Sequence, residues 1–285
     1  MPELRELRRK LDSLDGLREI VNAMRNLAAA YVRRAESALE GTRPYTEVVE
    51  TALQAAFSGP GMRAPGPLAG ARSLAVLFAS DQGLCGAYNE RAVRSIASFH
   101  AEADGNAAVA VVGLRAQALL RLKGIEAMLA RSAPASLEAI GSQVPELAAD
   151  LFEAYEQCGA ERMVFVYNAY EGMGRFRETV RCVLPPSPAE IGEGRTDVLR
   201  HDPLLTMPHG DLLGNLIEEY FFIQLYRALL EAHASENGAR LISMTSAAGS
   251  IDDRFQELTR EFQVVRQDAI TAELLDIVAG AEAQC

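Results

Sequence analysis

Residues 251–269 read "IDDRFQELTREFQVVRQDA", and their spacing decides the fold. Apolar residues recur at steps of four, three, four, three and four, at Ile251, Phe255, Leu258, Phe262, Val265 and Ala269. Alternating steps of three and four are the heptad pattern of a helix that packs along another helix. The same seam continues through Leu274, Ile277 and Val278. The stretch therefore predicts a long C-terminal helix that needs a partner helix.

The N-terminal residues carry a second stripe of the same kind. It begins with Leu4, Leu7, Leu11 and Leu14, and after a one-residue slip it continues with Leu17, Ile20, Met24, Leu27 and Tyr31. We interpret the slip as a stutter in the heptads. A helix over residues 3–57 would be about 80 Å long, which is more than an ordinary domain buries. Because the two stripes lie at opposite ends of the chain, we expect an antiparallel coiled coil, with two core helices of a bundle as the alternative.

The middle of the chain has a different period. Residues 58–70, "SGPGMRAPGPLAG", have the composition of a linker. Apolar runs at 73–80, 107–113, 162–168 and 178–184 resemble strands, and helical patterns at 88–103, 114–122 and 143–157 lie between most of them. Alternating strands and helices predict a small Rossmann-like α/β domain. A long polar connection, 185–211, leads back to the terminal helix.

The predicted fold class is therefore α/β, with a long antiparallel coiled coil of terminal helices. The expected divisions are an N-terminal shaft helix over 1–57, a linker over 58–72, the α/β domain over 73–210 and a C-terminal shaft helix over 211–285.

Composition narrows the class of partner. The net charge is −11 and only Lys10 and Lys123 are lysines, which argues against nucleic-acid binding because phosphates need clustered cations. No apolar run approaches about 18 residues, so we expect no direct membrane insertion. The charged N-terminus does not resemble a signal peptide. The four cysteines have neither metal-ligand nor disulfide-framework spacing, which favours a reducing cytoplasmic setting.

One short motif invites a chemical interpretation. Residues 80–89, "SDQGLCGAYN", follow the first strand and precede a helix. Ser80 and Asp81 are helix-capping residue types, Gly83 and Gly86 allow a tight turn, and Cys85 between them is the best nucleophile candidate. A catalytic thiol needs a base, and none of the four histidines stands in a recognisable motif.

Other chemistry finds no support in the sequence. The phosphate-binding patterns G-x-x-x-x-G-K-[ST] and G-x-G-x-x-G after a strand are absent, as are zinc-ligand motifs. We expect no cofactor, no metal and no catalytic residue. Two alternatives stay open: a coiled-coil adaptor with an α/β docking domain, and a cysteine-dependent enzyme that uses Cys85.

Three segments resemble the gamma subunit of F-type ATP synthases. They are "LDSLDGLREIVNAMRNLAAAYVRRAE" at 11–36 with "RPY" at 43–45, the turn "SDQGLCGAYN", and residues 236–283, which end in "RQDAITAELLDIVAGAEA". Their order along the chain also matches the family. The resemblance covers about a third of the chain.

The resemblance implies a non-catalytic rotor shaft that couples transmembrane ion flow to ATP synthesis or hydrolysis. Its partners would be the alpha and beta subunits of the catalytic ring, the epsilon subunit and the membrane-embedded c-ring. The complex would lie on the cytoplasmic face of the bacterial inner membrane.

The resemblance also implies roles for particular residues. Arg266, Gln267, Thr271 and Met24 match the family's contacts with the beta subunit, and antiparallel pairing would place Met24 close to Arg266 and Gln267. The turn formed by Ser80, Asp81, Gly83, Cys85 and Gly86 would face the bottom of the catalytic ring. Cys85 would then be a small structural thiol.

Overall fold

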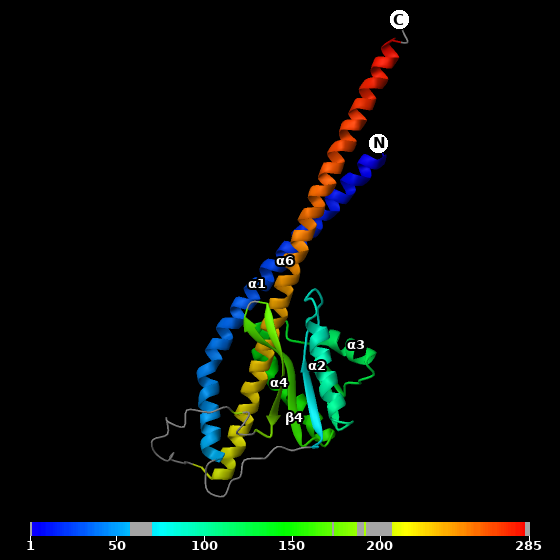
Figure 1. Ribbon diagram of the computed structural model, residues 1–285. Helices are drawn as coiled ribbons and strands as arrows, with labels where there is room; N and C mark the ends of the chain where they lie inside the picture. Colours follow the sequence, from blue (N-terminus) through cyan, green and yellow to red (C-terminus); the bar gives the residue numbers. More distant parts are fainter. Residues whose placement is uncertain (1, 58–69, 173, 187–190, 192–206, 283–285) are drawn as a thin grey trace. The chain divides into compact units, whose positions relative to one another are not determined.

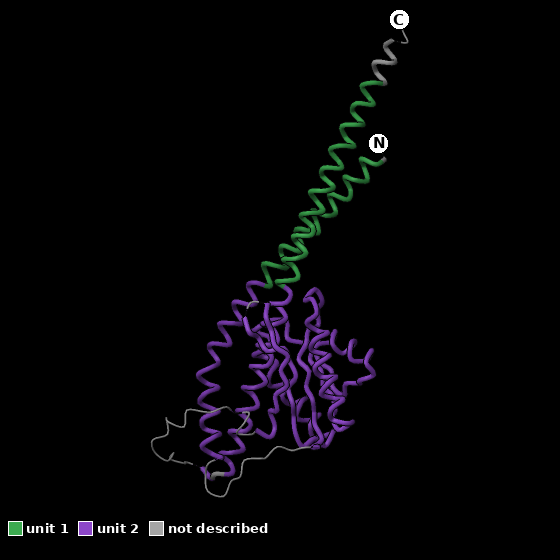
Figure 2. Tube along the Cα trace, viewed as in Figure 1, with its two compact units in different colours: residues 1–28, 241–285 green, residues 29–240 purple. Residues whose placement is uncertain are grey.

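A computed structural model describes residues 2–57, 70–172, 174–186, 191 and 207–282 (Figure 1). These residues form two compact units (Figure 2). Unit 1 contains residues 1–28 and 241–285, and unit 2 contains residues 29–240. Most of the predicted linker, 58–69, and most of the predicted polar connection, 187–190 and 192–206, lie outside the described residues.

Unit 2 is built on a five-stranded sheet. Its strands are β1 (Ser73–Phe78), β2 (Ala107–Val112), β3 (Leu129–Arg131), β4 (Arg162–Gly172) and β5 (Arg175–Leu184). Their order is β3-β2-β1-β4-β5; the first four run parallel and β5 runs antiparallel to β4. The four predicted strands are confirmed, and β3, with three residues, is an addition.

Helices cover both faces of this sheet, which explains the unbroken apolar runs of β1 and β2. Leu77 and Val111 pack on one face against α2 (Tyr88–Glu102) and α3 (Leu114–Leu122). Phe78 and Phe165 pack on the other face, in a core that includes α4 (Leu137–Gln157) and parts of the terminal helices. Helix α4 begins earlier than the pattern at 143–157 predicts because Ser136 caps it, accepting the Ala139 N–H at 3.2 Å.

The terminal helices are α1 (Pro2–Phe57) and α6 (His209–Glu282). After residue 208 the described part of the chain forms a single helix, α6, up to Glu282. Within unit 2, α6 buries Tyr220, Phe221 and Leu225 in the same core that holds Leu53 of α1. The predicted α/β class with two long terminal helices is confirmed.

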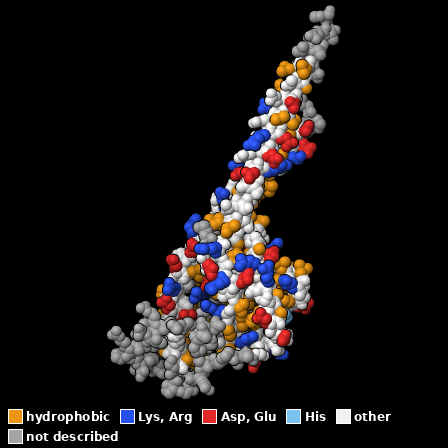
Figure 3. Space-filling model, in the orientation of Figure 1, with side chains coloured by type: hydrophobic (Ala, Val, Ile, Leu, Met, Phe, Trp, Pro, Cys, Tyr) orange, Lys and Arg blue, Asp and Glu red, His pale blue; other side chains and the backbone are white. Residues whose placement is uncertain are grey.

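Unit 1 is an antiparallel pair of helices, as expected. The Arg18 Nε donates to Asp252 Oδ1 at 2.9 Å, and nearer the N-terminus Leu14 shares a groove with Leu258. Residue numbers therefore rise along α6 as they fall along α1. Hydrophobic, acidic and basic side chains intermingle on the visible face of this pair (Figure 3).

The predicted stutter in α1 is wrong. Leu17, Ile20 and Leu27 are 51%, 59% and 53% exposed, so they lie outside the seam. Steps of three and four instead connect a series of buried or half-buried residues, with Asn22 and Met24 half-buried beside it: Leu4, Leu7, Leu11, Leu14, Arg18, Val21, Arg25 and Ala28. The seam admits Arg18 because its guanidinium reaches Asp252 and lies 5.9 Å from the Phe255 ring centroid. The apolar stripe of the sequence and the buried stripe of the helix pair thus differ by one residue.

No helix in the described part of the chain is long and apolar enough to cross a bilayer.

The shifted seam gives opposite expectations for two leucines of unit 1. Leu258 is 4% exposed, so Leu258→Ala removes buried contacts and lowers the free energy of unfolding of the helix pair by about 2–4 kcal/mol. Leu27→Ala is the control and changes it by less than about 0.5 kcal/mol. Urea titration of the full chain followed by circular dichroism at 222 nm measures both. Equal losses would place Leu27 in the seam.

Candidate functional site

The turn over residues 80–87 lies after the carboxyl end of β1, which is the edge where parallel α/β sheets commonly carry their sites. The backbone of β1 is close to that of β2 at this edge. A Cβ added to Gly113 would lie 2.7 Å from the Ala79 carbonyl carbon, and Gly113 has φ +127°. Glycine is therefore required at 113, and it lets α3 begin beside the turn.

Asp81 fastens the turn to its neighbours. Its Oδ1 accepts the Leu114 N–H at 2.7 Å, at the first residue of α3. Its Oδ2 accepts the Ala133 N–H at 3.1 Å and the Ser132 hydroxyl. The expected capping role of Asp81 is correct in kind, but the helix it caps is α3 and not the next helix in the chain. A carboxylate at a helix N-terminus is also favoured by the helix dipole.

Ser80 connects the turn to α6. Its backbone N–H donates to Asn89 Oδ1 at 3.0 Å, and its Oγ accepts the Gln82 N–H at 3.0 Å. The single hydroxyl proton lies between two acceptors at 2.8 Å, the Gln82 carbonyl and Glu236 Oε1. The Ser80 side chain is thus held by two residues, Gln82 and Glu236, and is fully buried.

Glu236 and Arg240 complete this connection, and we call Ser80, Gly83, Glu236 and Arg240 the clamp. Arg240 Nη2 donates to Glu236 Oε1 at 2.5 Å and to the Gly83 carbonyl at 3.5 Å. Arg240 Nη1 donates to Asn237 Oδ1 at 2.9 Å. The two charged side chains are only 8% and 13% exposed. One turn of α6 therefore holds the β1 turn at Ser80 and at Gly83.

Sequence reasoning singled out Ser80 and Gly83 but missed Glu236, Asn237 and Arg240. Their signal was present: polar residues at steps of one and three, inside a helical stretch whose other residues are mostly apolar or small, "LLEAHASENGARL" at 229–241. Polar residues on such a face need buried partners.

The environment of Cys85 disfavours nucleophilic chemistry. Burial raises the pKa of its thiol, and the neighbouring Glu236 carboxylate raises it further. The Sγ lies 3.7 Å from the Gln82 carbonyl oxygen and from Asn89 Nδ2. No hydrogen bond joins it to a histidine in the described part of the chain. Because the thiolate is the nucleophile, these neighbours give Cys85 a packing role.

The four residues expected to contact a beta subunit all lie in unit 1. Arg266, Gln267 and Thr271 are exposed on α6, and the Thr271 hydroxyl donates to the Gln267 carbonyl at 2.9 Å. Met24 is half-buried on α1. The structure thus places all four on the helix pair, three of them open to solvent.

The expected closeness of Met24 to Arg266 and Gln267 is wrong. Arg18 is paired with Asp252, and Arg266 is fourteen residues further along α6, or about 20 Å. Met24 lies six residues from Arg18 in the opposite direction, about 9 Å. The expectation failed because heptad patterns alone do not fix which residues of two long helices stand opposite each other.

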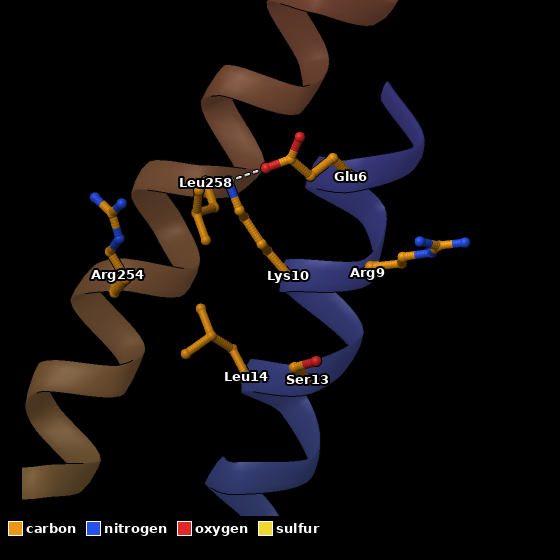
Figure 4. A pocket seen from close by; sticks show the side chains of 7 residues that line it. All are labelled: Glu6, Arg9, Lys10, Ser13, Leu14, Arg254 and Leu258. Atoms are coloured by element: carbon orange, nitrogen blue, oxygen red, sulfur yellow. Dashed lines mark ion pairs between the residues drawn. The ribbon is translucent and has the colours of Figure 1, made fainter. Parts of the chain in front are cut away.

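Along the helix pair of unit 1, a shallow groove lies between the position of Met24 and that of Arg266 (Figure 4). Leu14 and Leu258 point into it from the two helices, while Lys10 pairs with Glu6 at 2.7 Å along its rim. Among the described residues there is no group of three histidine, cysteine or acidic side chains placed to hold a metal ion. The groove is formed where the side chains of the two helices pack against each other.

The clamp predicts an uneven effect of removing two carboxylates. Glu236→Gln leaves Arg240 buried without its charge partner, so we expect the free energy of unfolding to fall by about 3 kcal/mol. Glu257→Gln breaks the exposed pair with Arg254 and changes it by less than about 1 kcal/mol. Chemical denaturation of both variants, with the parent chain as reference, measures the difference. Equal losses in the two variants would show that the clamp contributes no more to the stability of unit 2 than an exposed ion pair does.

His233 predicts a pH dependence. It is buried beside Tyr31, with ring centroids 5.6 Å apart, and burial lowers its pKa below the ordinary value, while Glu236 partly opposes this. The unfolded chain therefore binds the proton first as pH falls below about 6.5, and folding loses stability there. His233→Gln should reduce the loss in denaturation midpoint between pH 7.5 and 5.5. If the denaturation midpoint of His233→Gln falls as much as that of the parent chain, groups other than His233 cause the pH dependence.

Comparison with known proteins adds the family. A family model described as ATP synthase matches residues 3–284. The ATP synthase gamma chain of Fuscovulum blasticum is 31% identical over 99% of this chain and 100% of its own length. The ATP synthase gamma chain of Anaeromyxobacter sp. (strain Fw109-5) is 30% identical over 99% of both chains.

Solved structures agree on the fold. A chain of the Euglena gracilis mitochondrial ATP synthase (OSCP/F1/c-ring) has a TM-score of 0.68 at 18% identity, covering 99% of this chain and 95% of that chain. A chain of the Tetrahymena thermophila mitochondrial ATP synthase central stalk/c-ring has a TM-score of 0.59 at 21% identity, covering 80% and 99%. With matches along its whole length, this chain belongs to the ATP synthase gamma chain family.

Proposed function

We propose that this chain is the central rotating shaft of an F-type ATP synthase, coupling transmembrane ion flow to ATP synthesis or hydrolysis in a ring of alpha and beta subunits. The observation that carries the proposal is the match to gamma chains over 99% of the sequence. The gamma chain is a non-catalytic stalk subunit, and the buried, unactivated thiol of Cys85 agrees with that role. The helix pair of unit 1 gives a stiff element that other subunits can grip.

The proposed partners are the alpha and beta subunits, the epsilon subunit and the c-ring. The related Euglena and Tetrahymena structures are titled as assemblies with F1 or the c-ring. Because the most similar relatives named above are bacterial, we place the complex on the cytoplasmic face of the bacterial inner membrane. Within the chain, 1–57 and 211–285 would act as shaft helices, 58–72 as a linker and 73–210 as the domain below the ring.

Arg266, Gln267 and Thr271 are proposed to contact the beta subunit at one level of the shaft, and Met24 at another. Arg266 forms no ion pair with any described residue, so its guanidinium is open to a carboxylate of a partner, bidentate where the geometry permits. The turn of Ser80, Asp81, Gly83, Cys85 and Gly86 would face the bottom of the ring, held by the clamp.

Assembly tests the proposal directly. The full chain, co-expressed with the alpha and beta subunits of its own organism, should purify with both in a complex that hydrolyses ATP. A coiled-coil adaptor of another system would not assemble with these two subunits, and a cysteine-dependent enzyme would act without them. Failure to assemble, with all three chains soluble and folded, would overturn the shaft function.

Arg266→Ala should lower coupled turnover of the assembled complex by about tenfold while leaving the yield of complex nearly unchanged, since one charge-assisted contact is lost. Arg260→Ala is the matched control, an exposed arginine without a described ion pair on the same helix. ATP synthesis in reconstituted vesicles measures coupling, and gel filtration measures assembly. Identical turnover of both variants and the parent would make Arg266 an ordinary solvated residue.

A further inference from the structure

A small cavity of about 20 Å³ lies inside unit 2, next to the clamp. Strands β1 and β2 border it at their carboxyl ends, α4 borders it through Ile140, and α6 forms the remaining wall. Its polar lining residues are His233 and Glu236, both on α6, and the other lining residues are apolar. One water molecule needs roughly 10–15 Å³ and two to four polar partners. The cavity therefore has the volume for one water molecule and no room for a larger ligand.

Glu236 brings a hydrogen-bond acceptor to this cavity. Its Oε1 accepts the Ser80 hydroxyl at 2.8 Å and Arg240 Nη2 at 2.5 Å. Its Oε2 forms no hydrogen bond with any residue that the structure describes, although the side chain is only 13% exposed. An ionised carboxylate oxygen that is withdrawn from water needs a donor in place of the water it has lost. The Oε2 atom of Glu236 is thus an acceptor in search of a donor.

Neighbouring residues decide which nitrogen of the His233 ring carries a proton. Arg240 Nη1 donates to Asn237 Oδ1 at 2.9 Å, and because a guanidinium only donates, the oxygen of the Asn237 amide must face it. The Asn237 NH₂ group then donates to the His233 carbonyl at 2.9 Å and lies 3.3 Å from His233 Nε2. Its second hydrogen is available to Nε2 only if that nitrogen accepts. Nε2 is therefore the unprotonated nitrogen of the ring.

The single proton of the imidazole must then lie on Nδ1. Burial lowers the pKa of His233, so the ring is neutral at pH 7.5 and has one N–H group. The side chain is 8% exposed, and Nδ1 has no hydrogen-bond partner within the described ranges of the chain. Buried N–H groups are nearly always hydrogen-bonded. His233 therefore contributes a donor to the cavity to which Glu236 contributes an acceptor.

The geometry points to a bound water: we propose that the cavity holds one water molecule, which accepts the Nδ1–H of His233 and donates a hydrogen to Oε2 of Glu236. A divalent cation would need about six oxygen ligands, far more than this lining provides. An anion would be repelled by the Glu236 carboxylate. The inference does not depend on the shaft function, because every protein group that binds the water belongs to this chain.

The water closes a ring of hydrogen bonds along one face of α6. The ring runs from Glu236 to Arg240, from Arg240 to Asn237, from Asn237 to His233, and through the water back to Glu236. In such a ring each group is both oriented and polarised by the next, which strengthens the individual bonds. The water thereby fixes the tautomer of His233 and the orientation of the carboxylate that holds the β1 turn.

A crystal structure of the full chain tests the site directly. We expect one water peak at hydrogen-bond distance, about 2.5–3.2 Å, from both His233 Nδ1 and Glu236 Oε2. A cavity without a peak overturns the proposal. A peak surrounded by several further oxygen ligands also overturns it, since that pattern belongs to a cation.

Nuclear magnetic resonance of the chain, labelled with ¹⁵N at its four histidines, tests the tautomer at pH 7.5. We expect His233 to carry its proton on Nδ1, and this N–H to exchange slowly and to show a cross-peak to water, because it is buried. A proton on Nε2 contradicts the ring of hydrogen bonds and overturns the proposal. The variant His233→Phe assigns the signal, since it alone should lack it.

His233→Phe also tests what holds the water, because it keeps an aromatic ring and removes the N–H donor. We expect its crystal structure to lose the water peak. Tyr31→Phe is the matched control: it removes a hydroxyl from the ring that packs 5.6 Å from His233 but no member of the hydrogen-bond ring, so the water and the slow N–H should remain. A water retained in His233→Phe would overturn the proposal. If His233→Phe does not fold, the water peak and the tautomer of the parent chain decide.

Discussion

The buried ion pair of Glu236 with Arg240 is the interaction on which the arrangement of unit 2 depends. Moving two charges out of water is unfavourable unless their remaining hydrogen-bonding atoms also find partners. Here Ser80 and the Gly83 carbonyl, both in the β1 turn, supply such partners together with Asn237, while the Arg240 Nε has no hydrogen-bond partner among the described residues. Moving the turn away from α6 would therefore remove hydrogen-bond partners from the buried charges and lower the free energy of unfolding. Asp81 in the same turn also holds the start of α3, so the clamp and Asp81 together connect α6, the β1 turn and α3.

How much of this could be predicted depended on whether the pattern was local. Strands β1 and β2 are short runs of apolar residues, and such runs can be recognised as buried strands from the sequence alone. The helix pair was also predictable, because the steps from Ile251 to Ala269 demand a partner. The partner's register was not predictable: the more apolar stripe through Leu17 and Leu27 is exposed, while Arg18 lies in the seam. Periodicity favours the apolar stripe, whereas in the structure Arg18 pairs with Asp252 of the opposite helix and lies near the Phe255 ring.

The same limit explains the site. Ser80, Gly83 and Cys85 were visible as a motif because they are adjacent in the sequence. Glu236 and Arg240 lie about 150 residues away, so nothing local connects them to the turn. Their burial also changes the meaning of the motif. A cysteine between two glycines resembles a nucleophile, but the carboxylate of Glu236 and the burial around it raise the thiol pKa, which is the opposite of activation.

In the helix pair, α6 extends past the start of α1, and this leaves apolar side chains of α6 exposed. With Arg18 opposite Asp252, the first described residue of α1 stands opposite a residue near 268 of α6. Beyond that level no described residue of α1 stands opposite α6, and Ile270, Leu274 and Leu275 are each about half exposed or more. Apolar residues continue along α6 although none of the residues that the structure describes covers these three side chains. A monomeric protein gains no stability from exposed apolar residues on such an extension. A rotor shaft that ends inside a ring of alpha and beta subunits, in contrast, needs a surface that can turn against them. Arg266 is the last cation of the sequence, and the charged residues after it are all acidic: Asp268, Glu273, Asp276 and Glu282. Directional polar contact is then concentrated at a few positions, where a rotating element can make and break it in turn.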